Sequence, residues 1–319
     1  MNLRIGSRGS QLALWQANHV AALLRGQGHT VEIEIIKTTG DRLQEVTFAQ
    51  VGSKGMFTKE IEEALAAGRV DLAVHSLKDL PTELPEPFAL GATPPRVDPR
   101  DVFVSVKYAS LAELPQGARV GTSSQRRRAQ LKALRPDIEA IEFRGNVDTR
   151  LRKLAEGQVD AILLAAAGLD RLEKTEWVRE RLEPQDFCPA AGQGSLGIET
   201  RRDDAATLAA VAFLDDAATR FAVTLERAAL AALGGGCQVP IGIHCRAKVD
   251  EAGTEGNWYE IFAIVADPET GNAVRVYLSA ERADSDPAAL GRIVAEKLME
   301  SGAGALLQAH AAAADEAAR

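Results

Sequence analysis

Four short polar stretches carry residues suited to binding a small anion. They read GSRGSQ, HSLKDLP, GTSSQRRR and FRGNVDTR, and each follows a run typical of a β-strand. Arginine forks bind carboxylate or phosphate oxygens bidentately, and a charge-assisted hydrogen bond contributes roughly 1.5–3 kcal/mol. Taken singly, a serine before a helix is an ordinary N-cap and an arginine run is usually a solvated face. Four such stretches in one chain favour a site for a polyanionic small molecule.

The side chains in these stretches that could bind an anion are basic groups and hydroxyls. They are Arg8, Ser10, Ser76, Lys78, Thr122, Ser124, Arg126, Arg127, Arg144 and Arg150. Asp79 differs from them, because a carboxylate among arginines weakens anion binding unless it has another task. That task is either general acid–base work or the stabilisation of a cation. The alternative is an aspartate that caps a turn before Pro81.

The stretch LGGGCQVP places Cys237 directly after three glycines. Glycine allows positive φ, so the thiol is expected at the tip of a mobile loop, where it suits a covalent tether. A metal site would need several closely spaced ligands, whereas Cys237, His244 and Cys245 form a loose cluster without C-x-x-C spacing, so no metal is predicted. A buried structural thiol and a nucleophile with a histidine base remain alternatives.

The charge of the chain is unevenly distributed. Its 319 residues are 46% hydrophobic and carry a net charge of −8, yet Val120–Lys153 holds nine Lys and Arg against four Asp and Glu. One basic segment in an acidic protein favours a local anion site over nucleic-acid binding, which uses a wider basic surface. No apolar run approaches the roughly 20 residues that span a bilayer, and the N-terminus lacks a secretory pattern. We therefore expect a cytoplasmic protein that binds neither nucleic acid nor membrane.

Alternating strand-like and helix-like segments predict α/β architecture with mainly parallel sheets. The expected strands are 2–7, 31–37, 70–76, 118–124, 138–143 and 159–165, and the expected helices are 10–28, 59–68, 125–135 and 146–157. The first helix carries Leu12, Trp15, His19 and Leu23 at helical spacing, and the second carries Ile61, Ala64 and Leu65 on one face. Such an arrangement would bring the four polar stretches to the carboxyl ends of strands, where ligands of α/β proteins bind.

Two stretches rich in proline or glycine, 80–100 and 189–202, are expected to cross between domains. The pattern changes from about Asp215. A helix at 215–233, strands at 239–249, 258–267 and 273–281, a helix at 287–301 and a frayed helix after Gly304 are expected in succession. Strands grouped together with helices outside them indicate a small α+β domain.

Nine stretches between Arg4 and Gly242 closely resemble the hydroxymethylbilane synthases, also called porphobilinogen deaminases. They are RIGSRGSQLALWQA, GSKGMFTKEIE, DLAVHSLKDLP, DPRDVFVS, VGTSSQRRRAQL, FRGNVDTRLRKL, AAAGLDRL, AAGQGSLGIE and LGGGCQVPIG. The resemblance implies two α/β lobes like those of periplasmic binding proteins, with the active site in the cleft between them. The first lobe would comprise 1–95 and 194–213 and the second 96–193, and a small α+β domain, 214–319, would carry the cysteine loop.

The resemblance also implies the chemistry. In this family a dipyrromethane cofactor, made from the enzyme's own substrate, is attached through a thioether to the loop cysteine, here Cys237. Four porphobilinogen molecules are condensed head to tail on this primer, each losing ammonia, and hydrolysis frees the linear tetrapyrrole for porphyrin and heme synthesis. The expected protein is thus a transferase, and we expect it to act as a monomer.

Motif matches to the family assign further roles. The groups expected to bind the acetate and propionate side chains of the pyrroles are Arg8, Ser10, Lys54, Ser76, Lys78, Thr122, Ser124, Arg126, Arg127, Arg144, Arg150 and Arg171. Asp79 matches the catalytic aspartate, which stabilises positive charge on the pyrrole nitrogens and assists proton transfer. Phe57 is expected to pack on a pyrrole ring, and Gln193 to lie near the cleft.

The sequence departs from the family pattern at Gln50, where some relatives have a basic residue, and at Asp148, where some have glycine. Arg128 adds a third arginine, to which no ligand is assigned, because residues i and i+2 of a helix face differently. The strongest rival function is a non-enzymatic module whose two lobes close on an organic anion, with Cys237 as a structural thiol. A nucleic-acid binder that uses QRRRAQLKALR ranks third.

Overall fold

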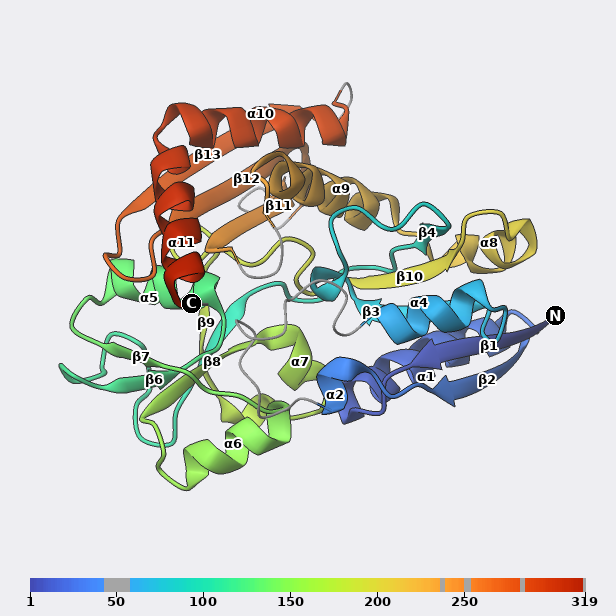
Figure 1. Ribbon diagram of the computed structural model, residues 1–319, viewed down its shortest axis with the longest axis horizontal. Helices are drawn as coiled ribbons and strands as arrows, with labels where there is room; N and C mark the ends of the chain where they lie inside the picture. The colour runs from blue at the N-terminus through green and yellow to red at the C-terminus, as the bar shows by residue number, and fades with distance from the viewer. Residues whose placement is uncertain (43–57, 236–238, 250–253, 282–284, 318–319) are drawn as a thin grey trace. The chain divides into compact units, whose positions relative to one another are not determined.

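The computed structural model describes residues 1–42, 58–235, 239–249, 254–281 and 285–317, which Figure 1 shows as a coloured ribbon. The chain divides into two compact units. Unit 1 comprises Met1–Asp98 and Gly194–Arg220, and unit 2 comprises Pro99–Gln193 and Phe221–Arg319. The described strands form one sheet in unit 1 and two in unit 2.

Unit 1 is built on a five-stranded sheet in the order β2-β1-β3-β10-β4. The strands are β1 (Asn2–Ser7), β2 (Thr30–Ile35), β3 (Leu72–Ser76), β4 (Phe88–Ala92) and β10 (Leu196–Arg201). β1 runs parallel to β2 and β3, whereas β10 runs antiparallel to both of its neighbours. The strands predicted at 2–7, 31–37 and 70–76 are therefore confirmed, and so is the mainly parallel direction of the sheet.

Helix α1 (Gln11–Gly26) forms as predicted, but its buried face differs from the apolar positions noted in the sequence. Those positions, Leu12, Trp15, His19 and Leu23, are half-buried or exposed, and the buried ones are Gln16, Ala17, Val20, Ala21 and Leu24. Two alanines on the buried face let the helix approach the sheet closely, so small side chains rather than aromatic ones fill the space.

The remaining described α-helices of unit 1 are short. They are α2 (Thr39–Arg42), α4 (Lys59–Ala66) and α8 (Ala205–Val211). In α4 the residues predicted to share one face, Ile61, Ala64 and Leu65, are all buried. They pack in a cluster with the side chains of Ile36 and Val70 beside the sheet.

Both stretches expected to cross between domains contain a strand, which corrects the interpretation of 80–100 and 189–202 as connections alone. β4 lies in the first stretch and pairs with β10, which lies in the second. Five of the six β10 residues are buried, Glu199 and Thr200 among them. A short strand that is covered on both faces shows no alternation of apolar and polar residues, so periodicity does not reveal it.

Unit 2 contains a second five-stranded sheet, in the order β7-β6-β8-β5-β9. The strands are β5 (Asp101–Val104), β6 (Arg119–Gly121), β7 (Glu139–Ile141), β8 (Ala161–Ala165) and β9 (Val178–Leu182). β5 runs antiparallel to β8 and β9, and β6 runs parallel to β7 and β8. The sheet thus repeats the pattern of unit 1, because in each the antiparallel strand is the fourth in order. β5 and β9 were not predicted, whereas the other three strands were.

The helices beside this second sheet are α5 (Gln125–Leu134), α6 (Val147–Ala155) and α7 (Ala166–Arg171). The first two begin where the sequence predicts, at polar side chains that cap them. Ser124 Oγ accepts a hydrogen bond from the Arg127 N–H, and Asn146 Oδ1 accepts one from the Thr149 N–H at 2.9 Å. The caps fix where the two helices start, directly after β6 and β7.

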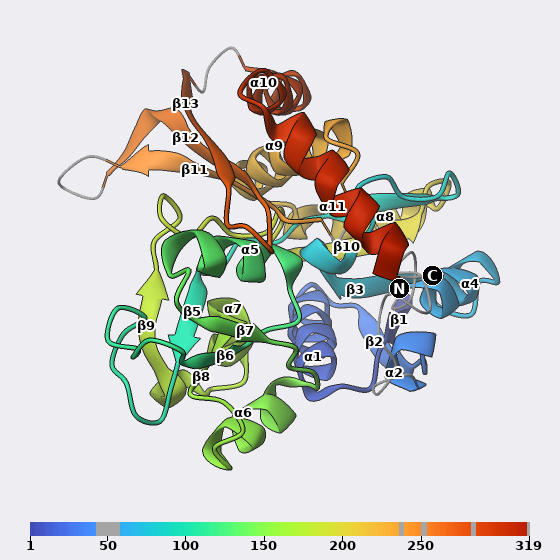
Figure 2. The ribbon, with the colours of Figure 1, turned by 60° about the vertical axis from the view of Figure 1, so that its left-hand side comes forward.

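The C-terminal part of unit 2 is the small α+β domain that the sequence predicts (Figure 2). Its antiparallel sheet has the order β11-β12-β13. The elements are α9 (Ala217–Ala232), β11 (Ile241–Val249), β12 (Glu255–Ala266), β13 (Ala273–Glu281), α10 (Pro287–Glu300) and α11 (Ala303–Ala317).

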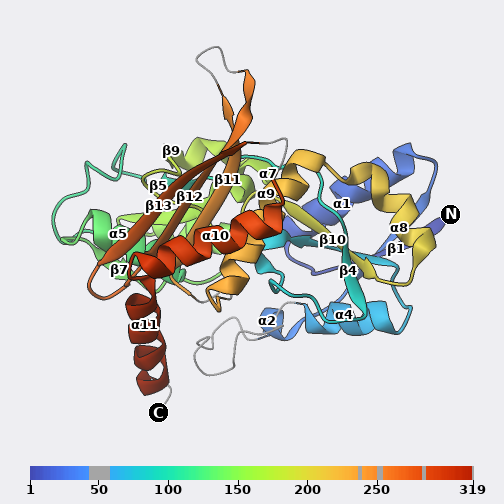
Figure 3. The same cartoon turned by 90° about the horizontal axis from the view of Figure 1, so that it is seen from above.

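The two faces of β12 contact different helices. Ile261 and Ala263 join the core formed with α9 and α10, whereas Ile264 packs with Ala129 of α5. Figure 3 shows α10 lying along the sheet and α11 continuing from it. No helix in the described part of the chain is long and apolar enough to cross a membrane.

Candidate active site

Four of the predicted site residues line one pocket in unit 1, beyond the carboxyl end of β3. They are Arg8, Ser10, Ser76 and Asp79, and the other lining residues are Leu12, Ala13, Gln16, Thr58, Ile61, Val74 and His75. Ligands of α/β proteins bind at this end of parallel strands, beside helix N-termini. Lys78, which lies between Ser76 and Asp79 in the chain, is half-buried and does not line the pocket.

The carboxylate of Asp79 is available to a ligand. Asp79 ends a short 3₁₀ turn, Leu77–Asp79, and its side chain is exposed. The turn is closed through the backbone, since the Leu80 N–H donates to the Leu77 carbonyl at 3.1 Å. Among the described residues none donates a hydrogen bond to the Asp79 carboxylate, so the alternative role as a turn cap gains no support.

The two serines of this pocket are already oriented by other groups. Ser10 is the N-cap of α1, and its hydroxyl accepts a hydrogen bond from the Ala13 N–H at 3.3 Å. The Ser76 hydroxyl accepts one from Gln16 Nε2 at 2.8 Å, and Gln16 is buried. Both hydroxyls therefore hold fixed positions on the pocket wall before any ligand binds.

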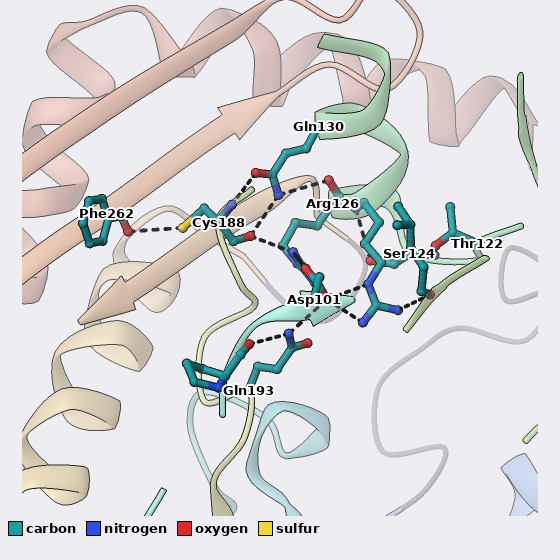
Figure 4. A network of polar contacts seen from close by, with 11 residues as sticks. Asp101, Thr122, Ser124, Arg126, Gln130, Cys188, Gln193 and Phe262 are labelled. Atoms are coloured by element: carbon teal, nitrogen blue, oxygen red, sulfur yellow. Dashed lines mark hydrogen bonds and ion pairs between the residues drawn. The ribbon is translucent and has the colours of Figure 1, made fainter. Parts of the chain in front are cut away.

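A second cluster lies in unit 2 and centres on Asp101, the first residue of β5 (Figure 4). Its Oδ2 accepts a hydrogen bond from Arg126 Nη1 at 2.6 Å, and its Oδ1 accepts one from Arg127 Nη2 at 2.7 Å. Gln193 Nε2 donates to the same Oδ1 at 3.0 Å and to the Pro99 carbonyl at 2.7 Å. Arg126 also donates to the Cys188 carbonyl at 2.6 Å.

Asp101 stays ionised in this buried position because two cations surround it. Burial alone would raise the pKa of Asp101, but the charges of Arg126 and Arg127 outweigh burial and hold that pKa well below its usual range. Burial lowers the pKa of Arg127, and the charge of Arg126 lowers it further, while Asp101 opposes both effects. Two guanidinium groups share one carboxylate, so the cluster retains positive charge.

The burial of these arginines corrects one expectation from the sequence. Arg126 and Arg127 are only 4% and 6% exposed, whereas the arginine run predicts side chains at an exposed strand end. Both lie in the first turn of α5 and point toward β5, a strand that the sequence pattern does not predict. Because β5 is not predicted, Asp101 is not predicted as a site residue either. It precedes an apolar run in DPRDVFVS, and a charged residue that is buried with such a run requires a buried partner.

Thr122 and Ser124 shape the turn that leads into α5. The Ser124 N–H donates to Thr122 Oγ1 at 3.2 Å, and Ser124 caps the helix in turn. The two hydroxyls therefore hold the backbone from which Arg126 and Arg127 project, and a ligand role would come in addition to this task.

Arg144 and Arg150 extend the basic cluster within unit 2. Arg144 Nε pairs with Glu142 Oε1 at 2.6 Å. Arg150 Nε is buried and has no hydrogen-bond acceptor among the described residues. Burial is the largest of the effects that lower the pKa of Arg150 to about 10; the charges of Arg127 and Arg144 act in the same direction, and Glu142 opposes them. Arg127, Arg144 and Arg150 have two carboxylate partners, Asp101 and Glu142, so positive charge remains that a bound anion would stabilise.

Arg171 is a further buried arginine of unit 2. It ends α7 and is 7% exposed, and burial lowers its pKa to about 10, with Asp170 acting in the opposite direction. Since α7 directly follows β8, Arg171 belongs to the same lobe of unit 2 as the basic cluster.

The glycines before Cys237 have a defined structural role. The Gly234 N–H donates to the Ala231 carbonyl and the Gly235 N–H to the Leu230 carbonyl, both at 2.9 Å, and Gly234 has φ +68°. This is the Schellman arrangement that ends a helix, here α9, and it favours glycine at the left-handed position. Two of the three glycines therefore terminate the helix, which the prediction of a freely mobile loop did not include.

Several predicted residues cannot be placed. Lys54, Phe57 and Cys237 lie outside the described residues, as does Gln50. The other two cysteines, Cys188 and Cys245, are buried, and neither forms a disulfide with a described residue. Among the described residues, no group of three or more His, Cys, Asp or Glu could hold a metal ion.

The remaining departures from the family pattern have structural partners. Asp148 Oδ1 pairs with Lys174 Nζ at 2.7 Å, which offsets its charge near the arginines. Arg128 Nη2 donates to the Ala140 carbonyl at 2.8 Å and so ties α5 to β7. Among the described residues, Asp101 accepts hydrogen bonds from Arg126 and Arg127 but not from Arg128, in line with the difference in direction expected at i+2.

Comparisons with known proteins identify the family of this chain. Residues 3–209 match the family profile described as "porphobilinogen deaminase, dipyromethane cofactor binding domain", and residues 220–300 match the C-terminal domain of the same family. A porphobilinogen deaminase of Nitratidesulfovibrio vulgaris is 50% identical over 309 residues, which cover 96% of each chain. One from Brevibacillus brevis is 47% identical over 306 residues, 95% of this chain and 96% of that one.

Among solved structures, the methionine-binding protein MetQ aligns with 67% of this chain and 89% of its own, at 13% identity and a TM-score of 0.44. The sequence matches are far closer, and they extend over nearly the whole length of the chain and of its relatives. This chain belongs to the porphobilinogen deaminase family.

Proposed function

We propose that this chain joins four porphobilinogen molecules head to tail on a dipyrromethane attached through a thioether to Cys237, and then releases hydroxymethylbilane by hydrolysis. As a member of its family the chain is a transferase of tetrapyrrole biosynthesis. The observation that carries the proposal is the match to the family's cofactor-binding domain over residues 3–209. A match of this extent covers both the Asp79 pocket and the basic cluster.

The basic cluster fits the charge of the proposed cofactor and substrate. Each pyrrole ring carries an acetate and a propionate, so a growing chain is a polyanion. The buried Nε of Arg150 without an acceptor, and the lowered pKa of Arg150, are what a binding site for carboxylates would show before its ligand is bound. We propose that Arg127, Arg144 and Arg150 bind these carboxylates, with Arg126, Arg171, Thr122 and Ser124 around them.

The Asp79 pocket fits the step in which porphobilinogen loses ammonia. Cleavage of that C–N bond leaves positive charge on the substrate's pyrrole ring. A fixed carboxylate stabilises this charge more than the ground state, which lowers the barrier. We propose that Asp79 supplies it, while Arg8 binds a substrate carboxylate and Ser10, Ser76 and Lys78 assist. The bound dipyrromethane would supply the free pyrrole α-carbon that acts as the nucleophile.

We further propose that the enzyme acts in the cytoplasm as a monomer that binds no nucleic acid. The arginines of the basic segment support the last point. Arg126 and Arg127 are buried against Asp101, and Arg135 pairs with Asp137 at 2.8 Å. A nucleic-acid surface would instead present such groups to solvent.

The intact mass of the purified protein tests the proposed attachment. We expect a covalent adduct of dipyrromethane mass, an aldehyde-reagent colour typical of pyrroles, and a modified peptide that contains Cys237. Cys237→Ser should lack both the adduct and turnover, while Cys245→Ala should keep the adduct. An unmodified parent would favour the rival anion-binding module, and an adduct on Cys188 or Cys245 would refute the assignment to Cys237.

Arg144→Leu is expected to lower turnover about 10- to 100-fold with little change in thermal stability, because it removes a charge-assisted contact to substrate and only a partly exposed ion pair. Arg126→Leu should lower both turnover and the melting temperature, because it also takes a partner from buried Asp101. Arg152→Leu is the control, since Arg152 is exposed and forms a surface ion pair with Glu156. Equal turnover in Arg144→Leu and Arg152→Leu would mean that Arg144 is a surface residue without a ligand.

A further inference from the structure

A buried pair of titratable side chains lies behind the Asp79 pocket and has no part in the chemistry above. His75 Nε2 and Glu199 Oε2 are 2.9 Å apart, and their side chains are 6% and 0% exposed. His75 lines the pocket, whereas Glu199 lies deeper, on the neighbouring strand β10. Opposite His75 in the ladder is Gly197, so Glu199 is the diagonal neighbour on the same face of the sheet.

The pair is one of three successive attachments that hold the end of β3. His75 bonds to Glu199 of β10, the Ser76 hydroxyl to Gln16 of α1, and the Leu77 N–H to the Ser195 carbonyl at 3.0 Å. Each attachment involves a different residue of the strand end; two lead to the segment 195–199, in and directly before β10, and one leads to α1. Asp79 follows two residues after the last of them, so its position depends on how firmly the three hold.

The surroundings make the His75–Glu199 contact hard to replace. Glu199 Oε1 is buried and has no hydrogen-bond partner among the described residues, so His75 is the one described side chain that satisfies this carboxyl group. Glu62 of α4 lies nearby. Burial raises the pKa of Glu62, and the charge of Glu199 raises it further, whereas Thr58 and His75 lower it. Without the imidazole, two carboxyl groups would face each other in a buried region.

We infer that His75 and Glu199 are positioning residues, which hold the end of β3 so that the Asp79 carboxylate faces the substrate's developing positive charge. The pair acts through the backbone and does not itself need to touch the reacting atoms. Electrostatic stabilisation depends steeply on placement, and a shift of about 1 Å can cost about 100-fold in rate. This inference rests on the proposed function for the role of Asp79, but the geometry of the pair does not.

Two substitutions at His75 separate positioning from simple packing. His75→Leu fills a similar space but leaves Glu199 without a donor, and we expect it to lower kcat about 10- to 100-fold with a smaller effect on KM. His75→Gln keeps an N–H donor near the position of Nε2 and should recover most of the lost kcat. Val211→Ala is the matched control, because it removes buried volume from the same unit away from the pocket.

A second measurement does not depend on turnover. In protein labelled with ¹³C-aspartate, the Asp79 carboxyl signal is identified by its absence from Asp79→Asn, and its chemical shift at neutral pH is measured. We expect this chemical shift to change in His75→Leu, because the carboxylate is displaced, and to stay near the parent value in His75→Gln and Val211→Ala.

The inference is overturned if His75→Leu keeps kcat within about threefold of the parent value. It is also overturned if the kcat of His75→Gln is as low as that of His75→Leu. The same holds if Val211→Ala lowers kcat as much as His75→Leu does when both variants lose the same amount of folding stability. An unchanged Asp79 carboxyl chemical shift in His75→Leu would also overturn it. A parent that does not convert porphobilinogen would instead refute the proposed function, and the Asp79 chemical shift would still decide whether the pair positions that side chain.

Discussion

Asp79→Asn is expected to lower turnover about 100- to 1000-fold while the protein still folds and still binds substrate. The substitution keeps the shape of the side chain and removes its charge. The carboxylate is exposed in the pocket and no described residue donates a hydrogen bond to it, so folding should not depend on it. Turnover and porphobilinogen binding should be measured on the same preparations.

Asp79→Glu is the companion variant, because it keeps the charge and moves it by one methylene. Asp79→Glu should retain more activity than Asp79→Asn. That difference would show that the loss of charge, and not a change in side-chain shape, causes the loss of turnover. Turnover of Asp79→Asn within about tenfold of the parent would reduce Asp79 to a surface residue of the turn and would remove the catalytic assignment.

Asp101→Asn is expected to lower the free energy of unfolding of unit 2 by about 3–5 kcal/mol, because it leaves two buried guanidinium groups without their counter-charge. Urea unfolding at neutral pH measures the difference. Asp137→Asn is the matched control, since Asp137 also pairs with an arginine of this lobe but at the surface, and it should cost much less.

The dependence on pH gives this prediction a second test. The pKa of Asp101 is lower in the folded protein than in the unfolded chain, so its stabilising effect is present above the unfolded value, near about pH 4, and is lost as the pH falls toward the folded value. The gap between parent and Asp101→Asn should therefore narrow in acid. An equal gap at pH 7 and pH 3 would show that the charge of Asp101 is not what stabilises the cluster.

Much of the fold could be predicted from periodicity, but not the strands that complete each sheet. β1, β3 and α4 carry regular apolar patterns and stand where expected. β10 reads as a glycine-rich connection with a glutamate and a threonine, and it becomes a strand because β3 and β4 lie on both sides of it. That pairing joins segments more than one hundred residues apart, and no local pattern records it.

The residues of the candidate site likewise include some that the sequence predicts and others that it does not. Residue type and motif predict Arg8, Asp79 and Arg150 as site residues, since the chemistry of each is local to its own stretch. Asp101 could not be recognised as the centre of a cluster, because its partners come from α5, whose arginines looked like a solvated face. His75 and Glu199 were missed for the same reason, as each depends on a neighbour from another strand.

The interleaved course of the chain has a consequence for its synthesis on the ribosome. The second lobe's sheet uses strands from Asp101 to Leu182, whereas unit 1 lacks β10 until residue 201 has been made. Among the described strands β10 is the one partner of β4, and it also covers one edge of β3. A nascent chain that has not yet reached β10 therefore exposes two unpaired strand edges, which tend to recruit other chains. Synthesis of the N-terminal lobe begins before that of the second lobe, yet its sheet is completed after the second lobe's sheet, so its strand edges stay unpaired throughout the interval between β4 and β10.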